Sequence, residues 1–204
     1  MFDSGIPVQD LIEELKNTEV DIALEIPDAT YVTWLNAVQQ LLYTEIIKEQ
    51  KKTTVAGVIN NPIDLSDIYD KAIENKPRFE DIHAVYARIG NNDIQLIKST
   101  IASGNIFPNT FYKDNNNIGY HTETEPEEMT IVYIAKPVLV GEAINDTNVM
   151  VPVEFIDLIK SKLRGEAYKL ANEDAIAAKW LNDYNAHLET FKAWISEKSS
   201  TFGL

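Results

Sequence analysis

Hydrophobic positions follow a helical period at both ends of the chain. Their spacing of three and four residues predicts an amphipathic helix over about 7–17 and a longer one from Asp28 to Lys52. Asp28 is a favourable N-cap, and Lys48, Lys51 and Lys52 are expected at the C-terminus of this helix, where cations are favourable. Two more helices are predicted over about 152–171 and 173–197, antiparallel because the joint between them is short. The residues expected on the buried faces of the longer helices are Tyr31, Trp34, Leu35, Val38, Leu41, Leu42, Ala177, Trp180, Leu181, Tyr184, Leu188 and Phe191.

The middle of the chain changes from a helical period to an alternating one. Residues 79–89 and 94–101 flank the turn sequence GNND and predict a β-hairpin. A second hairpin is predicted from two short strands, 110–113 and 118–124, joined by a polar turn. A further strand is predicted over 128–136, and the proline that follows ends it.

These elements predict an α+β fold, in which a helical bundle carries a central inserted region of antiparallel β-hairpins. Within the insertion, residues 53–78 indicate only a possible strand at TTVAGVI and a short helix around 65–75. The predicted divisions are N-terminal helices over 1–52, a β-rich insertion over 53–140, a C-terminal helix pair over 141–198 that packs with the N-terminal helices, and a flexible tail over 199–204.

Composition and charge narrow the classes of function. The 204 residues are 45% hydrophobic and 25% charged, which is typical of a globular protein, and the lack of cysteine excludes disulfides and thiolate chemistry. The net charge is −14, of which residues 1–151 contribute −13 from 11 basic and 24 acidic residues. An acidic chain is not attracted to nucleic-acid phosphates. The N-terminal residues do not resemble a secretion signal, and no apolar run approaches the roughly 20 residues of a membrane span, so no membrane partner is expected.

Candidate chemistry is confined to one short motif. The chain has no phosphate-binding or hydrolase signature, and its three histidines are scattered. In the sequence HTETE, His121, Glu123 and Glu125 alternate and would share one face of a strand, as metal ligands can. The preferred interpretation is a solvated turn, because Pro126 interrupts the run and two more glutamates follow it. We therefore predict no catalytic residue, no cofactor and no metal site.

The order of elements carries a resemblance that single motifs do not. The aromatic-led hairpin FYKDNNNIGYHTETEPEE leads into the strand TIVYIAKP, residues 130–137. A polar stretch then reaches VPVEF, residues 151–155, which opens a helix, and an acidic-led helix with Trp180 and Tyr184 closes the chain. Over about residues 79–195 this succession resembles the head-to-tail adaptor proteins, also called neck or head-completion proteins, of tailed bacteriophages. Residues 53–78 do not fit the pattern.

The resemblance implies a structural protein of the virion neck, made in the host cytoplasm and without catalytic residues. It implies a homo-oligomeric ring, a dodecamer in the virion, that binds the portal protein and downstream neck or tail proteins while DNA passes through its channel. Two alternatives stay open: a tail or baseplate binding module, and a metal-dependent hydrolase that uses His121 and the glutamates. The candidate partner-binding residues are Trp194, offset from the apolar stripe, and Phe202 and Leu204 in the terminal segment.

Overall fold

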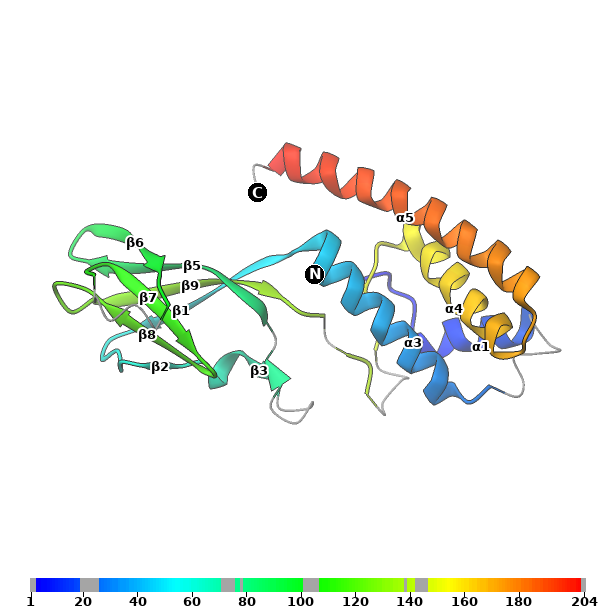
Figure 1. Ribbon diagram of the computed structural model, residues 1–204, viewed down its shortest axis with the longest axis horizontal. Helices are drawn as coiled ribbons and strands as arrows, with labels where there is room; N and C mark the ends of the chain where they lie inside the picture. Colours follow the sequence, from blue (N-terminus) through cyan, green and yellow to red (C-terminus); the bar gives the residue numbers. More distant parts are fainter. Residues whose placement is uncertain are drawn as a thin grey trace. The chain divides into compact units, whose positions relative to one another are not determined.

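The described α-helices come from the two ends of the chain, and most strands come from its middle (Figure 1). The computed structural model describes residues 3–18, 26–70, 76–77, 79–100, 107–137, 139–141 and 147–202. The chain divides into a helical unit, Met1–Ile47 with Pro137–Leu204, and a β unit, Lys48–Lys136. The α+β class is confirmed. The insertion expected over 53–140 begins and ends a few residues earlier.

The helical unit contains four α-helices among the described residues. They are α1 (Val8–Thr18), α3 (Asp28–Leu41), α4 (Ile156–Leu170) and α5 (Asp174–Phe202). A π-helical segment, Leu42–Ile47, continues α3, and a 3-10 turn, Val153–Phe155, precedes α4. Each helix buries residues at the predicted spacing, and together they form one core. Its fully buried members include Val8, Leu11, Ile12, Leu15, Tyr31, Leu35, Leu42, Leu158, Ile159, Leu163 and Phe191.

Five residues predicted for this core are less buried than expected. Leu41 is 46% exposed, and the half-buried residues are Trp34, Trp180, Leu181 and Leu188. The Trp180 ring lies under the guanidinium of Arg164, 4.7 Å from its centroid, and so covers charged rather than apolar groups. Helical spacing identifies a face, but the neighbouring helices decide how much of that face they cover.

Helices α4 and α5 are antiparallel and pack closely (Figure 1). At Gly165 of α4, a Cβ atom would lie 2.7 Å from the side chain of Leu181 of α5, so any larger residue would force Leu181 to shift. Nearer the start of α4, the rings of Phe155 and Phe191 meet edge to face with their centroids 5.0 Å apart. A small residue at one end and aromatic residues at the other fix the register of the two helices.

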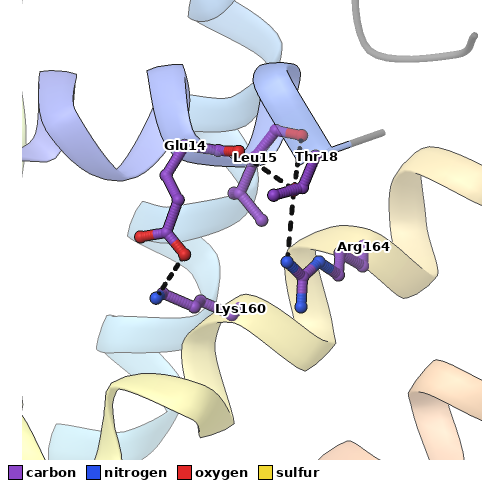
Figure 2. Close-up of polar contacts among 5 residues, drawn as sticks. All are labelled: Glu14, Leu15, Thr18, Lys160 and Arg164. Atoms are coloured by element: carbon purple, nitrogen blue, oxygen red, sulfur yellow. Dashed lines mark hydrogen bonds and ion pairs between the residues drawn. The ribbon is translucent and has the colours of Figure 1, made fainter. Parts of the chain in front are cut away.

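Polar contacts attach the N-terminal helices to the C-terminal part of the same unit. Figure 2 shows Glu14 accepting a 2.6 Å bond from Lys160, and Thr18 accepting a 3.2 Å bond from Arg164. The buried Gln39 side chain accepts a 2.6 Å hydrogen bond from the backbone N–H of Met150. These bonds join residues more than 100 positions apart in the sequence, and they complement the apolar core.

Two helix ends differ from the prediction. The helix expected to reach Lys52 ends at Ile47, because Lys48 adopts a left-handed conformation (φ 47°) and strand pairing begins at Gln50. Lys51 and Lys52 are therefore strand residues, and their assignment to a helix C-terminus was wrong. At the other end of the chain, α5 continues to Phe202, so residues 199–202, expected in a flexible tail, are helical.

The β unit is a curled, seven-stranded mixed sheet in the order β1-β9-β5-β6-β7-β8-β2. The predicted hairpins are confirmed as β5 with β6 and β7 with β8, but β6 and β7 run parallel, so the sheet is not wholly antiparallel. Where a helix was expected around 65–75, the described residues form a 3-10 turn, Ser66–Ile68, and the short strand β3, and residues 71–75 lie outside the described residues. The strands are β1 (Gln50–Ala56), β2 (Ile63–Asp64), β5 (Phe79–Ile89), β6 (Asn92–Lys98), β7 (Thr110–Asp114), β8 (Asn117–His121) and β9 (Glu128–Ala135), with β3 (Tyr69–Asp70) and β4 (Lys76–Pro77) forming a separate pair.

Strand β9 lies between β1 and β5 and pairs antiparallel with both. Its residues Met129 and Ile131 are fully buried in a second apolar core with residues of the neighbouring strands, such as Val85 and Leu96. The predicted central strand over 128–136 is therefore confirmed.

Replacing Phe191 by Ala is expected to destabilise the helical unit by about 3–5 kcal/mol, because it leaves a cavity beside Phe155. The three tryptophans, Trp34, Trp180 and Trp194, all belong to the helical unit, so their fluorescence during chemical unfolding reports on that unit alone. The control, Ser196→Ala on the exposed side of α5, is expected to change stability by less than about 0.5 kcal/mol. Equal effects of the two substitutions would contradict the described core.

Candidate partner-binding surfaces

The acidic motif forms an exposed turn between β8 and β9. Glu123, Glu125 and Glu127 are exposed, whereas Pro126 between them is buried. None of the residues 122–127 belongs to a strand. Pro126 therefore anchors the turn while the carboxylates around it point into solvent, which agrees with the preferred interpretation of the sequence.

Strand neighbours hold the end of this turn in place. The N–H of Glu127 donates to the carbonyl of Arg88 at 2.9 Å, and the carbonyl of Glu127 accepts from Gly57 at 3.3 Å. The Arg88 side chain binds Asp93 with Nε to Oδ1 at 2.9 Å, and Glu128 at 3.3 Å. The hydrogen bond to Asp93, with the charges of Asp93 and Glu128, raises the pKa of Arg88. Glu128 is thus neutralised locally, while the three exposed glutamates remain unpaired within the described part of the chain.

The structure does not assemble the alternative metal site. Among the described residues, no three His, Asp or Glu side chains are placed to hold a metal ion. His121 ends β8 and lies beside the ring of Tyr112, with the two ring centroids 6.0 Å apart. The glutamates that follow it lie beyond the end of the strand, so they do not share its face.

Asparagine 61 closes one edge of the sheet. Beyond the two-residue strand β2, the Asn61 side chain donates to the carbonyl of Tyr120 at 2.8 Å and accepts from its N–H at 3.2 Å. One side-chain amide thus replaces a strand neighbour. Partial burial, and secondarily the charge of Glu125, raises the pKa of the Tyr120 hydroxyl, so Tyr120 is a neutral side chain at physiological pH.

The residues predicted to bind partners lie at the end of α5. Trp194 is half-buried and stacks on Phe191, with centroids 6.1 Å apart, and it also contacts Phe155. The ammonium of Lys198 lies 5.4 Å from the centre of the Trp194 ring. Trp194 therefore contributes to the packing of its own chain. Phe202 is the last residue of α5, but its side chain, like the whole of Leu204, lies outside the described residues.

A groove in the helical unit was not predicted from the sequence. It has a volume of about 440 Å³ and is lined by Trp34, Ala37, Val38, Leu41, Lys162, Glu166 and Tyr184. Its two charged residues bind each other at 2.7 Å, and burial raises the pKa of the Tyr184 hydroxyl. A signal was present in the sequence, since Trp34 and Leu41 lie at the margin of the apolar stripe of their helix. The lining groups suit apolar contact rather than acid–base chemistry.

Comparison with known proteins gives no family for this chain. No protein-family model matches the sequence, and no curated protein matches it. In the part of the chain that the structure describes, no helix has the length and apolar character to cross a membrane.

Divalent metal ions are expected to leave the melting temperature of the protein unchanged, because the ligands of the HTETE motif do not converge. Replacing His121 by Ala is expected to cost less than about 1 kcal/mol, mainly through its contact with Tyr112. Melting followed by circular dichroism, with and without zinc or manganese, measures both effects. His83→Ala, on an exposed strand residue, is the matched control. Stabilisation by a metal that is lost only in His121→Ala would restore the hydrolase alternative.

Proposed function

We propose that the protein is a head-to-tail adaptor of a tailed bacteriophage, a structural subunit that forms a ring below the portal and leaves a channel for DNA. The observation that carries the proposal is the order of elements. Helices from both ends of the chain share one core, and a β unit is inserted between them. The residues of the resemblance, VPVEF and the long closing helix, lie in the helical unit.

The geometry of the VPVEF motif supports this proposal. Pro152 is the N-cap of the 3-10 turn that leads into α4, with φ −59° and ψ 144°. Phe155, three residues later, packs against both Phe191 and Trp194 of α5. The motif therefore both starts one helix and fixes it to the other, as a helical wall of a ring requires.

The distribution of charge gives further support. The helical unit has 8 basic and 19 acidic residues, a net charge of −11, whereas the β unit has 10 basic and 13 acidic residues, a net charge of −3. A ring whose helices carry excess negative charge repels DNA phosphates and lets a duplex pass without binding. Such a charge balance is unfavourable for a protein that must hold nucleic acid.

Electron microscopy of virions tests the proposal. An antibody against this chain is expected to label the neck, and the full chain purified with the portal protein of the same phage is expected to add a ring below the portal. Labelling of the tail tip or baseplate would favour the binding-module alternative. Absence of the chain from the virion would reject a structural role.

Deletion of residues 199–204 tests the contribution of the chain terminus. Phe202 and Leu204 are apolar residues at and beyond the end of α5, where a partner such as the portal could bury them. The truncated protein is expected to keep its melting temperature but to occupy fewer virion necks. Ser196→Ala, on the exposed side of α5, leaves the terminus intact and is the control. Equal occupancy of the full and truncated chains would show that these residues are dispensable.

A further inference from the structure

The two ends of the seven-stranded sheet differ in the length of their outermost strand and in the backbone pairing found there. At one edge, β2 pairs with Ile118 and Asn117, and the Asn61 amide binds Tyr120. At the other edge, β1 is seven residues long and pairs on one side only, with β9. No residue of β1 is buried. Within the described residues, β1 is therefore an unpaired edge of its sheet.

The register identifies the backbone groups that face outward. Ala135 donates to the carbonyl of Glu49 at 2.8 Å, and Gly57 donates to the carbonyl of Glu127 at 3.3 Å. Residues of an antiparallel strand alternate between facing the partner and facing away from it. Gln50, Lys52, Thr54 and Ala56 therefore direct their N–H and C=O groups away from β9. These groups can form the ladder of an added strand.

Charge selects the kind of strand that can bind. Lys48, Lys51 and Lys52 lie on or just before β1, and none of them forms an ion pair with a described carboxylate, in contrast to Lys98 and Lys136 of the same unit. A second β1 strand would bring lysines close together, and like charges on neighbouring strands are destabilising. Lysine on an edge strand disfavours pairing with neutral or basic strands, because its charge would stay uncompensated. An acidic strand would neutralise that charge.

An acidic segment without backbone partners occurs in the same chain. Thr122, Glu123, Thr124 and Glu125 form no backbone hydrogen bond with the described residues, and both glutamates are exposed. The turn that contains this segment ends at Glu127, whose carbonyl accepts from Gly57 on the β9 side of β1, opposite the open edge.

We propose that β1 of one copy binds the 122–125 segment of a second copy as an added strand. The inference rests on the proposed function, because a contact between two different surfaces of one chain is heterologous, and repeating it builds a ring when the rotation between copies closes. Backbone hydrogen bonds to Lys52 and Thr54 hold the segment, and the lysines around β1 neutralise Glu123 and Glu125.

Cysteine cross-linking tests this contact, because the natural chain has no cysteine. Full-length Lys52→Cys and Glu125→Cys proteins are mixed at low salt under mild oxidation. The mixture is expected to form a disulfide-linked dimer about tenfold faster than either protein alone. Salt at about 0.5 M is expected to slow the reaction, because it screens the charges.

Variants at Thr54 separate backbone pairing from simple proximity. Thr54→Pro in the Lys52→Cys protein removes an outward N–H without breaking the ladder to β9, so the cross-linking rate is expected to fall about tenfold. Thr54→Val keeps the N–H and is expected to leave the rate unchanged. Lys48→Glu with Lys51→Glu is a second test that leaves the backbone intact, and it is also expected to slow the reaction.

Three results would overturn the inference. They are equal rates for Thr54→Pro and Thr54→Val, self-cross-linking of Lys52→Cys that is as fast as the mixed reaction, and no mixed cross-link at all. If rings are seen in virion necks but the mixed cross-link is absent, the ring uses another contact and the adaptor function stands. If the cross-link forms but the chain is absent from necks, the contact stands and the adaptor function fails.

Discussion

The β unit depends on pairing both sides of strand β9. An interior strand needs hydrogen-bond partners for its backbone on either side, and each buried group left without one costs about 1–3 kcal/mol. β5 occupies one side and β1 the other, although they come from chain segments more than 20 residues apart. The requirement explains why EQKKTTVA, which contains good helix formers, leaves the helix at Lys48. Strand formation with β9 outweighs local helix propensity.

Elements encoded by neighbouring residues could be predicted from the sequence. The hairpins around GNND and DNNN, the strand that ends before Pro137 and the buried face of α1 depend on local periodicity and turn residues. The parallel pairing of β6 with β7 and the helix end at Ile47 could not be predicted, because both depend on contacts between distant segments. The half-exposed Trp34 has the same cause, since neighbouring helices leave a groove beside it.

The candidate surfaces also divide into those that local sequence predicts and those that depend on contacts between distant segments. The acidic turn could be located from Pro126 and its surrounding glutamates, because a charged run beside a proline is a local signal. The open edge at β1 could not be located, because strand order is needed to show which strand is last. Trp194 was recognised by its offset from the apolar stripe, but the same offset brings it onto Phe155 in its own chain. An unusual position in a helical pattern therefore does not separate packing within a chain from packing between chains.

The β unit begins and ends at adjacent points. Its first long strand is β1 and its last strand is β9. Where β1 begins and β9 ends, the N–H of Ala135 donates to the carbonyl of Glu49 at 2.8 Å. A segment whose ends are hydrogen-bonded neighbours can be exchanged for a short loop or for a different module without altering the path of the flanking helices. Recombination at these two points would thus change the surface presented by the protein in a single genetic event. The sequence of the helical unit, which has its own apolar core, would change independently of the β unit.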